Sequence, residues 1–213
     1  TILDGPPKDS FDALFVKSSR CPCGLTNYWR QYGDKKAWRE HALYHMEWWD
    51  GVVLSPGLDP YTLDGVACIY ANAPVREARL AERLALLMQR EMHYDFSLFH
   101  ADRHSDLRAY VVIHQYSAVA LAFVRITEHF GIYGMTNEKG YIHFDSLTPT
   151  PSIVGIFVCA GWRRQGVAQL LVRHVAKSEG CRPNELAWSL PLSEAGMVLA
   201  TSFGPKDLLR VSR

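Results

Sequence analysis

The residues with the clearest chemistry lie in a loop between a predicted strand and a predicted helix. The run at residues 153–158 is almost entirely β-branched and aromatic, as in a strand buried on both faces, and an amphipathic helix is predicted from Val167. The loop between them contains Arg163, Arg164, Gln165 and Gly166. Glycine lets the backbone approach a ligand closely, and the first amides of a helix have no partners within it. Together with the helix dipole and two arginines, the loop is suited to bind a diphosphate.

Two common phosphate-binding motifs are excluded by the spacing of this loop. No Gly-Lys-Ser/Thr follows it, so it is not a Walker loop, and the G-x-G-x-x-G pattern of dinucleotide-binding proteins is absent. The simplest alternative is a surface turn that carries arginines between a core strand and a helix. The six residues by themselves leave that alternative open.

A second set of residues has the composition of a metal site. Cys21 and Cys23 flank a proline and precede a glycine, while His41 and His45 lie one helical turn apart and share a helix face. Thiolates and imidazoles are the usual ligands of structural Zn²⁺, although the Cys-x-Cys spacing is one residue shorter than usual. We therefore predict a structural zinc bound by these four side chains, which leave no open position for catalysis. The alternative is a reduced thiol pair and two surface histidines.

Composition excludes several classes of protein. The chain has 213 residues, 48% of them hydrophobic, and a formal net charge of +1, so it has no broad cationic field for nucleic acid or an anionic membrane. No apolar run approaches the roughly 20 residues that a membrane span needs. The first eight residues lack the pattern of a secretory signal, and five cysteines do not make a disulfide framework. We expect an intracellular, cytoplasmic protein, or a nuclear one if the source is a eukaryote.

Differences in composition along the sequence predict that the chain has two parts. Residues 1–60 are rich in Cys, His and Trp and end in a turn-forming stretch, so we expect a small zinc-finger-like module and linker there and a mixed domain at 61–213. In that domain, hydrophobic periodicity predicts helices at 73–93, 167–177 and 193–202. It predicts strands at 66–70, 108–114, 119–126, 140–144, 153–158 and 185–190.

The loop residues resemble motif A of the GNAT superfamily of N-acetyltransferases, a strand followed by Arg/Gln-x-x-Gly-x-Gly/Ala at the start of a helix. The order of predicted elements over roughly residues 65–210 is also similar. The resemblance implies an α+β fold with a central mixed, mostly antiparallel sheet that is splayed at the bulged motif A strand and flanked by helices. It implies acetyl-CoA as the donor, with pantetheine in the gap and a strand amide stabilising the oxyanion. The contacts it implies are the main chain of Phe157 and Val158 to pantetheine, and a diphosphate wrapped by Arg163, Arg164, Gln165, Gly166, Val167 and Ala168.

The paired Cys and His residues make the resemblance narrower. Cohesin acetyltransferases carry a small Cys2His2 finger before the same type of domain, an Arg-Arg pair in motif A, and a late strand that ends in serine. The matching positions here are Cys23-Gly24, His41 with His45, Arg163-Arg164, the segment from Glu185 to Ser189, Gly196 and Ala200-Thr201. The chain departs from that family at Leu190 and Arg173, which replace acidic residues, and at Gly166, which the family lacks. The architecture is implied, and the acceptor is left open.

Acetyl transfer to an amine needs the neutral amine, so a general base is useful. The candidate catalytic residues are Ser189, Glu194 and Asp145. Ser189 matches a family serine near the substrate and could orient the amine or relay a proton. The ordinary explanation of Glu194 is a residue at a helix start after Ser193, and that of Asp145 is a turn residue. The tyrosine that protonates the leaving thiolate in many relatives has no counterpart here, since Ala200 falls near that place.

Two hypotheses about function follow. The first is an acetyl-CoA-dependent N-acetyltransferase with a zinc-stabilised N-terminal module, which moves the acetyl group to a primary amine by direct attack. A protein lysine is slightly favoured because a finger can act as an interaction surface, and an aminosugar or polyamine is the other kind of acceptor. The second is a catalytically inactive module that binds CoA. DNA recognition is weakly supported, because one finger reads only about three base pairs.

Overall fold

We describe a computed structural model of the chain. It describes residues 35–55, 65–92, 106–127, 130–134, 149–204 and 208–212. The predictions for Cys21, Cys23, Asp145 and the strand at 140–144 lie outside these residues. The chain divides into two compact units, residues 1–46 and 47–213.

The described part of the first unit belongs to helix α3 (Lys35–Asp50), whose last turn lies in the second unit. Between residues 40 and 46, His41 and Tyr44 are buried, whereas Leu43 and Met46 are exposed. The alternation at three- and four-residue spacing gives this stretch one buried face, on which the two predicted metal-binding histidines lie.

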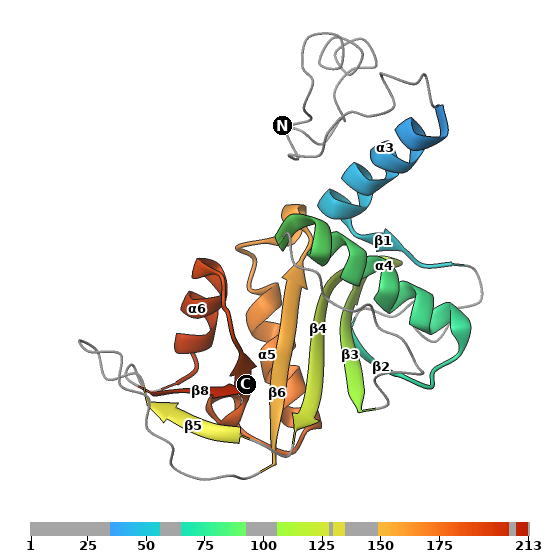
Figure 1. Ribbon diagram of the computed structural model, residues 1–213. Helices are drawn as coiled ribbons and strands as arrows, with labels where there is room; N and C mark the ends of the chain where they lie inside the picture. Colours follow the sequence, from blue (N-terminus) through green and yellow to red (C-terminus); the bar gives the residue numbers. More distant parts are fainter. Residues whose placement is uncertain are drawn as a thin grey trace. The chain divides into compact units, whose positions relative to one another are not determined.

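The second unit is built on a mixed sheet (Figure 1). Its strands run in the spatial order β2-β3-β4-β6-β7-β8-β5, with β1 paired to β4. The β6–β7 and β7–β8 pairs are parallel and the other pairs are antiparallel. The mostly antiparallel sheet expected from the sequence is confirmed. The strands are β1 (Val52–Val53), β2 (Gly65–Tyr70), β3 (Leu107–His114), β4 (Ser117–Thr127), β5 (Phe130–Gly134), β6 (Thr150–Val158), β7 (Ala187–Ser189) and β8 (Leu208–Ser212).

Helices α4 (Val75–Met92) and α5 (Val167–Ser178) pack on opposite faces of the sheet, while α6 (Glu194–Thr201) lies beside β8 (Figure 1). The alternation of β3 explains the two layers, since Tyr110 and Val112 belong to the core under α5, while Val111 between them is buried on the opposite face of the sheet. Each helix buries an apolar stripe at three- and four-residue spacing. The stripes are Leu80, Leu84, Leu87 and Met88 in α4, and Leu171, Val172, Val175 and Ala176 in α5.

The C-terminal end of α5 is attached to β3 by a buried carboxylate. Glu179, whose side chain is only 3% exposed, forms an ion pair with Arg108 at 2.9 Å and accepts a hydrogen bond from the hydroxyl of Tyr110 at 2.6 Å. Burial, and then the bond to Glu179, raises the pKa of Tyr110, so the phenol stays protonated. These contacts fix the direction in which the other end of α5 points.

Most predicted elements of this unit are confirmed, with differences at the ends. Strand 185–190 shortens to β7, because a 3-10 turn at Pro183–Glu185 occupies its start. Strands β5 and β8 were not predicted from the sequence. The strands predicted around Gln115 do form a hairpin, in which Gln115 and Tyr116 adopt positive φ values of 44° and 65°. Among the described helices, none has the length and apolarity of a membrane span.

Candidate active site

Strand β6 loses one of its two neighbours halfway along its length. Its residues Ser152 and Ile153 pair with Ala187 and Trp188 of β7, and no later pair joins the two strands. On the other side β4 accompanies β6 to Val158. The pairing with β4 skips one residue of β6 between Ile153 and Gly155, which is a β-bulge. The bulge and the splay that the resemblance implied are therefore both present.

The bulge and splay correct one expectation from the sequence. The strand was expected to be buried on both faces, yet only Ser152, Ile153 and Phe157 are buried. Residues 154–156 and 158 are partly exposed. The continuous apolar run thus reflects a strand that is open along one edge in its second half.

Alternation along the strand shows which backbone groups face the opening. The amide of Cys159 donates to the carbonyl of Val119 in β4 at 2.9 Å. Successive residues of a strand direct their N–H and C=O groups to opposite sides, so Phe157 faces β4 while Ile156 and Val158 face the opening. The residues with main-chain groups toward the gap are therefore Ile156 and Val158, rather than the expected Phe157 and Val158.

The turn after β6 presents free amides to the same region. A 3-10 turn (Ala160–Trp162) leads into Arg164 and Gly166, which have φ values of 64° and 79°, and Gly166 is the N-cap of α5. A Cβ built at Gly166 would have no atom within 4 Å. Within the described residues, the amides of Val167, Ala168 and Gln169 have no hydrogen-bond acceptor. We call the turn and these amides, residues 164–169, the cradle.

The side chains of the cradle divide into one that closes the turn and one that faces outward. Gln165 donates through Nε2 to the carbonyl of Gly161 at 2.8 Å, which holds the turn together. Arg164 is exposed and forms no hydrogen bond or ion pair in the described part of the chain. A solvent-open groove of about 420 Å³ begins at Gly166 and continues along the outer face of α5, lined by Gln169, Leu170, Arg173, His174 and Lys177.

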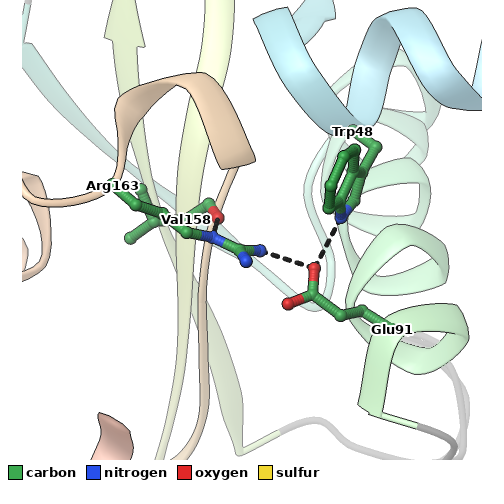
Figure 2. Close-up of polar contacts among 4 residues, drawn as sticks. All are labelled: Trp48, Glu91, Val158 and Arg163. Atoms are coloured by element: carbon green, nitrogen blue, oxygen red, sulfur yellow. Dashed lines mark hydrogen bonds and ion pairs between the residues drawn. The ribbon is translucent and has the colours of Figure 1, made fainter. Parts of the chain in front are cut away.

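Arg163 is engaged by the protein itself (Figure 2). Its Nε donates to the carbonyl of Val158 at 2.8 Å, and its Nη2 lies 2.5 Å from Oε2 of Glu91 at the end of α4. The same carboxylate oxygen accepts from Nε1 of Trp48 at 2.6 Å. The Arg163 Cζ lies 5.7 Å and 5.8 Å from the ring centres of Trp48 and Phe157. Of the two arginines expected at the diphosphate, the structure leaves Arg164 available.

The last turn of α3 packs against the start of the same loop. A Cβ at Gly161 would lie 2.8 Å from the carbonyl oxygen of Trp49, so only glycine fits there. Trp162 donates through Nε1 to the carbonyl of Asp50 at 3.0 Å. Glu47, in the same turn, forms an ion pair with Arg83 of α4, while burial raises the pKa of that carboxyl.

Ser189 lies where β6 and β7 part. It follows Trp188, the last β7 residue paired with β6, so in the register it stands beside the bulge. Leu190 comes next and is 51% exposed. Ser193 caps α6 by accepting from the amide of Gly196 at 3.1 Å, and Glu194 is the exposed first residue of that helix. The capping interpretation of this segment is confirmed for Ser193.

Cys159, directly after β6, is fully buried, and burial raises its pKa to about 12. At neutral pH it is a protonated thiol, which is a poor nucleophile. The site therefore offers backbone amides, a serine and an exposed arginine, and no activated thiol.

The two histidines of the predicted zinc site face each other. Their Nε2 atoms lie 3.0 Å apart, and burial lowers the pKa of His45, which favours the neutral imidazole that binds metals. Two nitrogens bound to one tetrahedral Zn²⁺ lie about 3.3 Å apart, close to the distance here. Among the described residues no group of three or more potential ligands occurs, and Cys21 and Cys23 lie outside them.

Comparisons with known proteins show the fold. No family model and no curated protein sequence matches the chain. Among solved structures it is similar to the xEco2 acetyltransferase domain bound to a CoA conjugate, with 22% identity over 70% of this chain and 93% of that one and a TM-score of 0.56. A second structure of the xEco2 acetyltransferase domain has 21% identity, covers 70% of this chain and 91% of that one, and gives a TM-score of 0.54. The chain thus has the same fold as these acetyltransferase domains.

Proposed function

We propose that this protein is an acetyl-CoA-dependent N-acetyltransferase of the GNAT type. One observation carries the proposal: the open edge of β6 leads directly into the cradle. A strand edge that exposes peptide groups can pair with the two amides of a pantetheine arm, much as it would pair with another strand. The free amides, the helix dipole and Arg164 at the end of that edge suit a diphosphate. Acetyl-CoA carries both groups in this order.

In this arrangement the donor contacts three parts of the chain. The backbone of Ile156 and Val158 meets the pantetheine, and the turn from Arg164 to Ala168 encloses the diphosphate. The groove on α5 continues from Gly166, and its side chains Arg173 and Lys177 offer positive charge to the rest of the nucleotide.

Acetyl transfer then needs no covalent intermediate between the substrate and the protein. The neutral amine nitrogen attacks the thioester carbon, the C–S bond breaks, the nitrogen loses a proton, and the departing thiolate of CoA gains one. An amide N–H on the open edge of β6 stabilises the oxyanion of the tetrahedral intermediate. Ser189, beside the bulge, orients the amine or relays its proton, either directly or through water.

The acceptor is a primary amine, and a protein lysine is the favoured one. The fold it shares with xEco2 supports this choice, because one structure of the xEco2 domain is bound to a K105-CoA conjugate, in which K denotes lysine. Leu190 next to Ser189 is exposed where the resembled family has an acidic residue, so the surroundings of the acceptor differ from that family. A small amine such as an aminosugar or polyamine is the other class to test.

We also propose that the first unit binds one structural Zn²⁺ through Cys21, Cys23, His41 and His45. The facing Nε2 atoms and the lowered pKa of His45 support the described half of this donor set. Native mass spectrometry of the protein, before and after chelation, should show one zinc per chain. Loss of the metal from a His41→Ala variant would support the assignment, and retention would contradict it.

The proposed activity is tested in two steps. Calorimetry should detect binding of CoA, and thiol release from acetyl-CoA should then depend on the amine supplied. The panel should contain lysine peptides, polyamines and aminosugars, with intact-mass analysis of each product. Absence of CoA binding overturns the proposal, and binding without turnover on any amine identifies a CoA-binding module instead.

A further inference from the structure

We propose that Arg163 is a positioning residue that holds the open edge of β6, and that Glu91 commits it to this role and keeps it off the diphosphate. We call Arg163, Glu91, Trp48 and the carbonyl of Val158 the brace. The inference rests on the proposed function and assigns different tasks to two adjacent arginines that the sequence alone does not distinguish.

Two nitrogens of the Arg163 guanidinium already have hydrogen-bond partners within the protein. A guanidinium grips a phosphate best through two parallel N–H groups on one edge. Here Nε donates to Val158 and Nη2 donates to Glu91. Each edge of the guanidinium that could bind a phosphate with two N–H groups includes at least one of these nitrogens, so neither edge has both donors free. Both aromatic rings lie within the roughly 6 Å range of a cation–π contact. The guanidinium is therefore held by ring contacts as well as by hydrogen bonds.

The brace acts on the part of β6 that the donor would contact. The carbonyl of Val158 faces the opening, but one of its two lone pairs already accepts from Arg163, which makes it a weaker partner for pantetheine. The main partners that β6 offers at these two residues are therefore the N–H and C=O of Ile156 and the N–H of Val158. The brace thereby fixes both the place where β6 ends and the hydrogen-bond pattern that it presents.

The contact with Glu91 determines which of the two roles Arg163 has. The side chains of Arg163 and Glu91 are 38% and 31% exposed, and a pair this open to solvent is weak by itself. Its carboxylate oxygen also accepts from Trp48, so the three side chains form one network. Without the charge of Glu91, Arg163 would be a partly exposed cation one residue before the cradle, free to turn toward the diphosphate.

The two roles give opposite results for Glu91→Gln. If Arg163 positions β6, this variant weakens CoA binding, and we expect a rise in Kd of about fivefold to tenfold by calorimetry. If Arg163 is a diphosphate ligand that Glu91 merely holds in the free protein, the variant tightens binding. Glu47→Gln is the matched control, because it breaks another Glu–Arg pair between α3 and α4, and it should leave the Kd unchanged.

Salt dependence separates the two arginines. Direct contact with the diphosphate is screened by salt, so Arg164→Gln should flatten the dependence of Kd on ionic strength. Arg163→Gln should raise Kd to a similar extent as Glu91→Gln but keep the salt dependence of the unmodified protein. A flattened dependence in Arg163→Gln would overturn the inference.

A double-mutant cycle without CoA tests the brace itself. Glu91→Gln and Arg163→Gln should be non-additive in urea unfolding, with the double variant about as stable as the weaker single one. If the charge variants fold poorly, Trp48→Phe serves instead: it keeps an aromatic ring, removes the Nε1 donor, and should give a smaller loss of CoA affinity. Additive effects in the cycle overturn the inference. Failure of the unmodified protein to bind CoA overturns the proposed function and the inference with it, whereas tighter binding by Glu91→Gln overturns the inference alone.

Discussion

The two halves of β6 differ in sequence and in the strands beside them. In the first half, residues 152 and 153 pair with β4 on one side and with β7 on the other, whereas residues 154–158 keep only β4 and leave their other edge open. The first half, Thr-Pro-Ser-Ile, buries Ser152 and Ile153. The second half, Val-Gly-Ile-Phe-Val, is partly exposed at every residue but Phe157 although it is the more apolar of the two. An open strand edge is normally covered or avoided in proteins. Here the opening is flanked by the cradle, so we interpret the first half as support and the second as the binding edge.

This comparison predicts that substitutions beside the first half of β6 lower the stability of the protein. Trp188 is paired with Ile153 and is 1% exposed, so Trp188→Ala should lower the free energy of unfolding by about 3–5 kcal/mol. Urea denaturation measures the loss. Leu190→Ala, two residues further on and half exposed, is the control and should change stability by less than about 0.5 kcal/mol. Equal losses in both variants would show that β7 does not support β6 in this way.

Substitutions in the cradle, which follows the second half of β6, should weaken the binding of CoA. Gly166→Ala places a methyl group in the cradle and strains a residue at φ 79°, so we expect Kd for CoA to rise about thirtyfold and stability to fall by about 1 kcal/mol. Gly180, at φ 70° after the other end of α5, is the matched position. Gly180→Ala should cost the same stability and leave CoA binding intact, and a parallel loss of binding there would contradict the cradle.

A smaller effect is expected for the exposed arginine of the cradle. Arg164→Gln should raise Kd for CoA about fivefold at low ionic strength, and less as salt is added. Arg79→Gln removes the same charge from the exposed face of α4 and should have little effect. If both variants weaken binding alike, general charge rather than the cradle attracts the coenzyme.

The smallest effect concerns Cys159, the residue that follows the open half. With a pKa of about 12, about one molecule in 10,000 carries the thiolate at pH 8, and the side chain is fully buried. Iodoacetamide should therefore modify Cys68 and Cys181 before Cys159, as followed by peptide mass analysis. Incubation with acetyl-CoA should leave Cys159 unacetylated, and an acetylated Cys159 would replace direct attack with a covalent intermediate.

The sequence was sufficient for the parts of the site whose cause is local. Gly166 at a helix start, two arginines and a β-branched run are neighbours in the chain, and they predicted the strand, the cradle and α5 correctly. The hydrophobic spacing of α4 was equally clear. The short strands β5 and β8 have no such signal, since each depends on a partner far away in the sequence.

The role of Arg163 could not be read from the sequence. Glu91 lies 72 residues before it, and no local pattern distinguishes its carboxylate from the other acids of α4. Arg163 and Arg164 are adjacent and chemically identical, yet the side chain of Arg163 contacts Glu91 of α4 while that of Arg164 is exposed. The proposed division of roles between the two arginines therefore rests on long-range contacts that no sequence pattern shows. The pairing of β6 with β4, which is also long-range, turns the main-chain groups of Ile156, rather than those of Phe157, toward the opening.

The packing of residues 47–50 against the loop has a practical consequence for anyone who trims this chain. A shortened protein that begins at residue 61 would retain the whole sequence motif at residues 163–168. It would nevertheless lack Trp48, the carbonyl groups that meet Gly161 and Trp162, and strand β1. A fragment intended for kinetics or crystallisation should accordingly start no later than Glu47.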